Sequence, residues 1–139
     1  MLFRSPACYS PLTASNTLAD NVTLAGRGQN ISGNTGTLKT CYVPVQSDAT
    51  CLAAFPSQFK AYMHCAGTDT EGFGKGDSGG PVLVAVSNSN PGSLTGVAAL
   101  GGPGTTGKYS VFTSVAPSTP YPEWIQNTMK NNIIAPLCP

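Results

Sequence analysis

Charged side chains are scarce in this sequence of 139 residues. It holds seven Lys and Arg and six Asp and Glu, which is 9% of the chain, whereas an average globular protein has roughly 25%. The net charge is only +1 and the basic residues form no cluster, so we predict no nucleic-acid partner, which would need a basic patch. No apolar run approaches the roughly 18 residues of a membrane span, and no His, Cys or carboxylate cluster has metal-ligand spacing. We therefore predict no membrane partner, no metal and no cofactor.

Turn-forming residues are abundant: the chain has 16 glycines and 12 prolines, and 40% of its residues are hydrophobic. Short runs rich in β-formers recur between Gly, Asn and Pro turns, which predicts an all-β antiparallel sandwich or barrel. A length of this order fits one domain. We expect strands in residues 22–25, 38–46, 61–66, 82–86, 94–100 and 109–115. Two helices are also predicted, one capped by Ser47 and ending at Phe55, and one over 123–131 with Pro122 in its first turn.

The body of the chain has the features of a secreted protein. It contains five cysteines and two glycosylation sequons, Asn21-Val22-Thr23 and Asn30-Ile31-Ser32, which predict an extracellular glycoprotein. From the sequence we do not expect the first residues to form a signal peptide, because Arg4 is not followed by an apolar stretch. Five is an odd number, so at least one cysteine has no partner within this chain. Either it is a free buried thiol, or its partner lies in a missing upstream part.

The strongest single signal is the hexapeptide Gly-Asp-Ser-Gly-Gly-Pro at 76–81, which leads into the apolar run 82–86. Glycines on both sides of Ser78 allow a sharp turn that exposes its hydroxyl. They also let the N–H groups of Gly76 and Ser78 converge on one point, which is the arrangement of an oxyanion hole. Taken alone, a tetrapeptide of this kind also fits an ordinary glycine-rich loop.

The complete hexapeptide resembles the nucleophile segment of the chymotrypsin-like (trypsin-type) serine peptidases. Other segments, in the same order along residues 20–127, are similar to further landmarks of that family: Val-Thr-Leu-Ala-Gly-Arg-Gly at 22–28, Cys51, Met-His-Cys-Ala-Gly at 63–67, Gly-Val-Ala-Ala-Leu-Gly at 96–101, Ser-Val-Phe-Thr-Ser-Val at 110–115 and Trp124-Ile125. Arg27 departs from the family, which carries Trp there. The resemblance implies a trypsin-like fold, with residues 1–139 forming the second six-stranded antiparallel β-barrel and a C-terminal helix. It also implies a disulfide between Cys51 and Cys65, and leaves the pairing of Cys8, Cys41 and Cys138 open.

In such an enzyme Ser78 would be the nucleophile, and the N–H groups of Gly76 and Ser78 would hold the oxyanion. Asp77 would be structural and would pair with the amine released by zymogen cleavage. A serine hydroxyl needs a histidine base and a carboxylate that orients that base. The family supplies both from a first barrel that this chain does not contain. His64, the only histidine, is expected to be an ordinary strand residue.

The resemblance also predicts a substrate pocket, with Gly72 at its base and Gly101 and Ser110 on its walls. Its other predicted members are Lys75, Ala99 and Leu100. Because Gly72 replaces the aspartate of trypsin-type members, a neutral or apolar substrate side chain is expected. Ala99 and Leu100 replace a serine and an aromatic residue of the family's cleft.

Two functions remain open. The first is a serine endopeptidase that acts on proteins or peptides, here a partial domain inactive alone because the first barrel is missing. The alternative is a secreted, non-catalytic homologue that binds a protein or peptide partner. A weaker third reading is a barrel that associates through exposed apolar surface.

Overall fold

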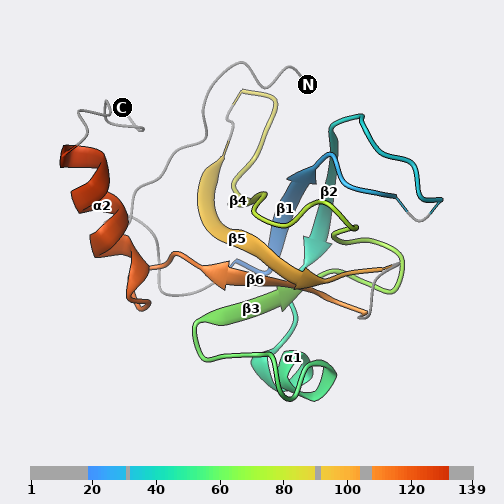
Figure 1. The fold of residues 1–139 in the computed structure, drawn as a ribbon, viewed down its shortest axis with the longest axis horizontal. Helices are drawn as coiled ribbons and strands as arrows, with labels where there is room; N and C mark the ends of the chain where they lie inside the picture. Colours follow the sequence, from blue (N-terminus) through green and yellow to red (C-terminus); the bar gives the residue numbers. More distant parts are fainter. Residues whose placement is uncertain (1–18, 31, 90–91, 104–107, 132–139) are drawn as a thin grey trace.

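The computed structural model describes residues 19–30, 32–89, 92–103 and 108–131. Within these residues the chain forms six strands and two helices (Figure 1). All strand pairs are antiparallel, and the order across the sheet is β2-β1-β4-β5-β6-β3. The elements are β1 (Asn21–Gly26), β2 (Lys39–Pro44), α1 (Asp48–Ala54), β3 (Met63–Ala66), β4 (Pro81–Val84), β5 (Ser93–Gly101), β6 (Ser110–Ser114) and α2 (Tyr121–Asn131). The expectation of an all-β fold with antiparallel strands is confirmed.

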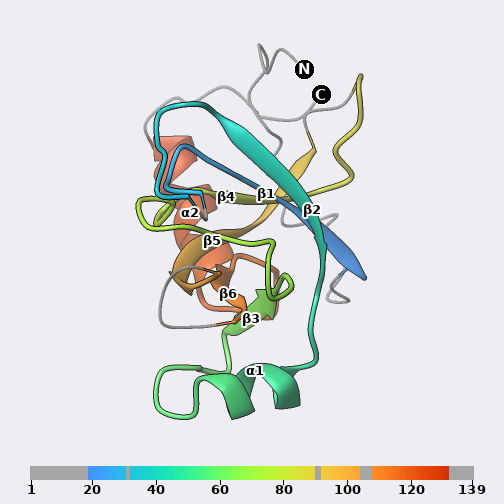
Figure 2. The same ribbon diagram turned by 90° about the vertical axis from the view of Figure 1, so that its right-hand side faces the viewer.

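The sheet curls until its two outer strands meet. The chain just after β2 forms a single antiparallel bridge with the end of β3, between Val45 and Ala66. Two backbone bonds flank this bridge: the Gln46 N–H donates to the Cys65 carbonyl at 2.9 Å, and the Gly67 N–H donates to the Pro44 carbonyl at 2.9 Å. The curvature is visible when the molecule is turned by 90° (Figure 2). The sheet therefore closes on itself like a barrel, with a short seam.

Inward-facing apolar side chains fill the curled sheet. One cluster joins side chains from β1, β2, β4 and β6, among them Val22, Val43, Val82 and Phe112, each with 0% exposure. Burial of four such side chains gives roughly 1.5–3 kcal/mol each relative to leaving them in water, which makes this cluster a main source of stability. A second cluster, Cys51, Phe55, Cys65 and Val111, attaches α1 to the barrel.

The predicted strands all exist, but several are shorter than expected. The run 82–86 was predicted to be one strand, whereas β4 ends at Val84. Ala85 has a φ of 57°, a left-handed conformation that L-residues with a Cβ rarely adopt and that breaks a strand. The run 38–46 likewise shortens to Lys39–Pro44, and Val45 then pairs with Ala66 of β3.

Both predicted helices are present. The Ser47 hydroxyl accepts the Thr50 N–H at 3.2 Å and caps α1, as the sequence indicated. The helix α2 begins at Tyr121 rather than at residue 123, and the Tyr121 ring packs edge-on against Tyr62 with centroids 5.9 Å apart. In the described part of the chain, no helix is long and apolar enough to cross a bilayer.

Candidate active site

The loop that precedes β4 carries Ser78 and is shaped by glycine. The Asp77 N–H donates to the Gly74 carbonyl at 3.1 Å, which closes a four-residue turn. Gly76, the third residue of this turn, has a φ of 99°, the positive value that a type II turn needs and that glycine adopts without steric cost. Ser78 follows at the surface and is exposed. The sequence prediction of a sharp turn with an exposed serine is therefore met.

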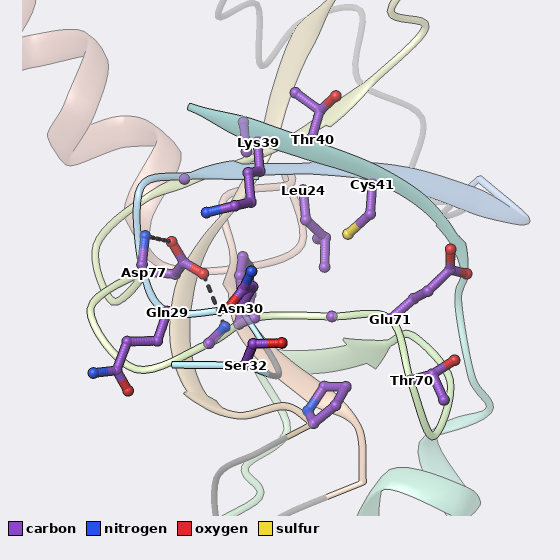
Figure 3. Close-up of a pocket in the computed structure, with 17 residues that line it drawn as sticks. Leu24, Gln29, Asn30, Ser32, Lys39, Thr40, Cys41, Thr70, Glu71 and Asp77 are labelled. Atoms are coloured by element: carbon purple, nitrogen blue, oxygen red, sulfur yellow. Dashed lines mark hydrogen bonds between the residues drawn. The ribbon is translucent and has the colours of Figure 1, made fainter. Parts of the chain in front are cut away.

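The side-chain carboxylate of Asp77 anchors this loop. Asp77 Oδ1 accepts the Gly28 N–H at 2.6 Å, and Asp77 Oδ2 accepts the Gly74 N–H at 2.8 Å (Figure 3). A Cβ on Gly26 or on Gly28 would overlap the Asp77 side chain, so both glycines are required for the carboxylate to reach these donors. The expectation that Asp77 pairs with the amine released by zymogen cleavage remains a prediction. The carboxylate here is held by two backbone donors.

The peptide between Lys75 and Gly76 has a defined orientation. The Gln29 N–H donates to the Lys75 carbonyl at 2.8 Å. The described peptides include no cis bond, and in a trans peptide the C=O and N–H groups point in opposite directions. The Gly76 N–H is therefore directed away from Gln29. Among the described residues, neither the Gly76 N–H nor the Ser78 N–H has a protein acceptor.

A hollow of about 400 Å³ lies beside Ser78, and we call it the Ser78 hollow. It brings together six of the predicted site residues, and its lining also includes Gln29, Phe73, Gly74 and Ala98, which sequence reasoning did not identify. The six predicted members are Lys75, Gly76, Ser78, Ala99, Leu100 and Gly101. No carboxylate of the described residues lines this hollow.

Two predicted pocket residues lie elsewhere. Ser110 has 0% exposure, and its Oγ accepts the Phe73 N–H at 2.7 Å. A Cβ on Gly72 would overlap Ser110 Oγ and lie 2.8 Å from Pro103 Cδ. Neither Gly72 nor Ser110 lines the Ser78 hollow, and Gly72 lines a second hollow instead. The role of these two residues in a substrate pocket remains a prediction.

A second hollow, of about 370 Å³, adjoins the first. We call it the Asp77 hollow, since Asp77, Glu71, Gly72 and the Cys41 thiol line it (Figure 3). Cys41 is the free cysteine among the described residues. Burial, together with the negative charges of Glu71 and Asp77, raises the pKa of the Cys41 thiol from its ordinary 9.0 to about 11. A thiol with so high a pKa is protonated at neutral pH and is a poor nucleophile.

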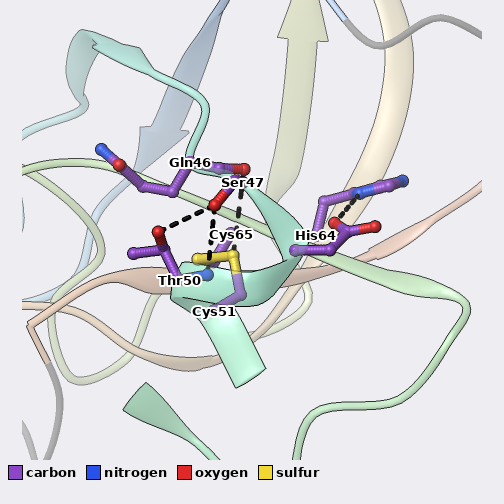
Figure 4. Close-up of polar contacts among 7 residues, drawn as sticks. Gln46, Ser47, Thr50, Cys51, His64 and Cys65 are labelled. Carbon is purple, nitrogen blue, oxygen red and sulfur yellow. Dashed lines mark hydrogen bonds and ion pairs between the residues drawn. A yellow bond between two sulfur atoms is a disulfide. The ribbon is translucent and has the colours of Figure 1, made fainter. Parts of the chain in front are cut away.

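The histidine is placed on another part of the barrel. His64 lies on β3, which β5 and β6 separate from β4 in the sheet order. Its Nδ1 is 3.1 Å from Asp48 Oδ1 (Figure 4), and its ring packs 6.0 Å from the Phe112 ring. It does not line the Ser78 hollow, so it occupies the ordinary strand position that the sequence predicted.

The disulfide expected from the family resemblance is present. Cys51 on α1 and Cys65 on β3 are bonded, with their Cα atoms 5.8 Å apart (Figure 4). Within the described residues, no three His, Cys, Asp or Glu side chains are grouped so that they could hold a metal ion.

Comparison with known proteins identifies the family to which this geometry corresponds. The family model described as Trypsin matches residues 3–125. Trypsin-3 of Salmo salar is 37% identical over 110 residues, which cover 74% of this chain and 42% of that protein. Trypsin of Sus scrofa is 34% identical over 141 residues, which cover 92% of this chain and 57% of that protein. The chain thus spans about half the length of the curated relatives it matches.

Solved structures agree with the sequence match. The structure of neuropsin, a serine protease expressed in the limbic system of mouse brain, superposes with a TM-score of 0.70 at 27% identity, covering 90% of this chain and 54% of that one. The scabies mite inactivated protease paralogue S-I1 shares the fold, with a TM-score of 0.67 at 23% identity over 91% of this chain and 53% of that one. The matched hexapeptide, the curled antiparallel sheet and these likenesses lead to one conclusion: the chain belongs to the trypsin family of chymotrypsin-like serine peptidases.

Proposed function

We propose that this chain is the C-terminal barrel of a secreted serine endopeptidase domain and that it is inactive without a first barrel. In this proposal Ser78 attacks a peptide carbonyl, and the N–H groups of Gly76 and Ser78 stabilise the oxyanion. The observation that carries it is the Lys75–Gly76 peptide, which the Gln29 N–H holds with the Gly76 N–H turned away and without a protein acceptor. Pre-set donors of this kind stabilise a transition state because they need no reorganisation during the reaction.

The missing component is a general base. A serine hydroxyl is a weak nucleophile at neutral pH until a neighbouring histidine takes its proton. Ser78 Oγ has no hydrogen-bond partner among the described residues, and His64 contacts Asp48 instead. The catalytic histidine and aspartate would come from the first barrel, which is therefore the proposed intramolecular partner of this chain.

Labelling with a fluorophosphonate tests this proposal. The purified 139-residue chain is expected to label no faster than its Ser78→Ala variant, while trypsin of Sus scrofa labels fully in parallel. Joining a family first barrel to the N-terminus is expected to raise labelling at Ser78 and not in the Ser78→Ala version. Rapid labelling of the isolated chain at Ser78 would show that it needs no first barrel.

The alternative is a non-catalytic homologue that binds a protein or peptide. Ala99 and Leu100 favour it, because they line the Ser78 hollow where the family resemblance leads us to expect a serine and an aromatic residue. Cleavage of denatured protein by the joined two-barrel chain separates the two functions. Binding without cleavage would support the alternative.

We further propose that substrates present a neutral or apolar side chain to this site, since no carboxylate lines the Ser78 hollow to pair with Arg or Lys. Secretion is supported by the Cys51–Cys65 disulfide, because such bonds persist in oxidising compartments. In the secretory pathway Asn30 is the better glycan acceptor of the two sequons. It is exposed, whereas Asn21 lies on β1, paired with Pro44, and its sequon partner Thr23 is only 8% exposed.

A further inference from the structure

We propose that β2 pairs edge to edge with β2 of a second copy of this chain, so that two barrels join through one antiparallel ladder. The interaction surface is the free side of residues 39–43, which we call the β2 edge. None of these residues lines the Ser78 hollow. The dimer therefore goes beyond the proposed cleavage reaction and requires neither a base nor a first barrel.

The β2 edge begins where the seam ends. β2 is the first strand in the sheet order and lies at a border of the sheet (Figure 1). The Gly67 N–H donates to the Pro44 carbonyl in the seam, but the chain then turns, and the Thr68 N–H donates to the Glu71 carbonyl at 2.9 Å. Among the described residues, no backbone bond from this turn reaches the β2 edge. The edge is therefore open to another strand.

The open side presents the backbone groups of Thr40 and Tyr42. The Val45 N–H donates to the Asp20 carbonyl beside β1 at 2.9 Å, whereas the N–H of the next residue, Gln46, donates to β3 on the other side. Backbone groups alternate in direction along a strand, and the pairing of β2 with β1 is unbroken. The N–H and C=O groups of Thr40 and Tyr42 thus point away from β1. In the described part of the chain they have no partner.

A second copy of β2 matches these groups in one antiparallel register. When Cys41 lies opposite its own counterpart, Thr40 of each copy lies opposite Tyr42 of the other, and opposed residues of this kind exchange both N–H···O bonds. A shift by two residues would set Pro44 opposite Thr40, where proline has no N–H to donate. A shift the other way would need Leu38, which precedes β2. The register centred on Cys41 is therefore favoured.

The side chains of the edge fit this register. Tyr42 is 71% exposed and would lie across from Thr40 of the second copy, and aromatic and β-branched side chains that face each other stabilise paired strands. A hollow of about 570 Å³, lined among others by Thr40, Tyr42, Ala85 and Val86, gives the second tyrosine ring room. At the centre the Cys41 thiols are protonated at neutral pH, so they bring no charge into the pair.

Charge makes the β2 edge complementary to its own copy. Lys39 begins β2, and Asp20 lies beside the other end, where its carbonyl accepts the Val45 N–H. Both side chains are exposed, and neither has an ion-pair partner among the described residues. Antiparallel pairing brings each Lys39 toward Asp20 of the second copy, with Cα atoms about 12 Å apart in an ideal sheet. The long lysine side chain reduces the separation of the two charges to less than the Debye length of about 8 Å. This match assigns the edge to a second copy.

Sedimentation equilibrium of the 139-residue chain tests the pairing. We expect a monomer at about 1 µM and mostly dimer at about 1 mM, since small interfaces bind weakly. Over the same range, amide hydrogen exchange followed by NMR should slow at Thr40 and Tyr42, whose N–H groups become bonded, and not at Lys75, which is exposed and lies outside the edge. A chain that stays monomeric at about 1 mM would refute the proposal and leave the edge to a strand of another protein.

A backbone variant identifies the surface. Tyr42→Pro removes an N–H that the barrel itself does not use, and proline is tolerated on edge strands. It should raise the dissociation constant of the dimer at least about tenfold, whereas the matched control Tyr42→Phe, which keeps the N–H and the ring, should leave it unchanged. A dimer that survives Tyr42→Pro would show that the copies associate through another surface.

Charge reversal tests the register without altering the backbone. Lys39→Glu and Asp20→Lys should each weaken the dimer about threefold to fivefold, and the double variant should restore it. Lys60→Glu changes an exposed lysine outside the edge and should have no effect. A double variant as weak as the single ones would overturn the register, and with it the proposal. Fluorophosphonate labelling at Ser78 reports on the proposed catalysis and not on this dimer.

Discussion

Asp77 Oδ1 accepts the backbone N–H of Gly28 at 2.6 Å across 49 residues of sequence. This bond joins the end of β1 to the loop that carries Ser78, two segments that are distant in the chain. Asp77 is also the last residue of the turn that contains Gly76, so this link helps to hold the loop that borders the Ser78 hollow.

The first prediction concerns Gly26, whose Cβ would have three atoms of the Asp77 side chain as its nearest neighbours. Gly26→Ala should lower the free energy of unfolding by about 1–3 kcal/mol through overpacking, and Asp77→Ala by about 2 kcal/mol through loss of bonds to a charged acceptor. The double variant should cost at least about 1 kcal/mol less than the sum. Urea unfolding measures all three.

A matched cycle uses Gly28, whose Cβ would lie 2.8 Å from the Asp77 backbone nitrogen as well as near its carboxylate. Truncating Asp77 leaves that backbone contact. Asp77→Ala should therefore offset the loss of stability caused by Gly28→Ala much less than the loss caused by Gly26→Ala. Strict additivity in the Gly26 cycle would mean that the glycine is required for another reason.

The second prediction is a pH dependence from Cys41. Its pKa is raised from 9.0 to about 11 in the folded state, so the folded state holds the thiol proton more tightly than the unfolded chain does. The resulting stability is fully present below pH 9 and is lost as pH rises through 11. Relative to Cys41→Ala, the wild type should lose up to about 2 kcal/mol over this range, since the half-buried thiol is partly screened by water. Urea unfolding at pH 8 and pH 11 gives the free energy of unfolding of both proteins. An equal change between the two pH values for the wild type and for Cys41→Ala would contradict a buried, protonated thiol.

The third prediction concerns the Cys51–Cys65 disulfide, which closes a loop with a sequence separation of 14. A loop of this length restricts the unfolded chain enough to give about 3 kcal/mol of stability. The double variant Cys51→Ala/Cys65→Ala should therefore have a midpoint of urea unfolding well below that of Cys41→Ala, which removes a thiol that forms no bridge. A midpoint similar to that of Cys41→Ala would show that α1 packing alone holds this part of the barrel.

The fourth prediction distinguishes the two sequons. When the chain is secreted from a eukaryotic cell behind an added signal peptide, Asn30 should carry a glycan and Asn21 should not. Asn30→Gln should abolish the mass lost on glycosidase treatment, whereas Asn21→Gln should leave it unchanged. A glycan mapped to Asn21 would mean that modification precedes the pairing of β1 with β2.

The elements with strong local patterns were predictable from the sequence. The apolar run that contains Val82 predicted a buried strand, and Ser47 predicted the start of α1, because each depends on a few neighbouring residues. The hexapeptide around Ser78 predicted the turn for the same reason, since its glycines determine the backbone locally. The strand end at Val84 was missed because the positive φ of Ala85 is imposed by the surrounding structure and not by alanine.

Long-range bonds explain what the sequence did not predict about the site. The bond from the Phe73 N–H to the fully buried Ser110 hydroxyl, 37 residues away, was not anticipated, while the place of Ser110 on a pocket wall stays a prediction. Gln29 was not identified at all, although its N–H fixes the Lys75 carbonyl. Its contribution is a backbone group, which every residue except proline possesses, so no side-chain pattern could have indicated it.

The seam between Val45 and Ala66 has a consequence for how this domain could aggregate. Strand edges that lose their partners are templates for pairing with other molecules. Here the two backbone bonds of one bridge, and a bond from Gln46 Nε2 to the Gly67 carbonyl, separate a closed sheet from one with two open borders. Cys65, whose carbonyl accepts one of those bonds, is also covalently tied to α1. A reducing environment would therefore weaken the seam itself, and self-assembly into β-rich aggregates should begin there before the core around Phe112 unfolds.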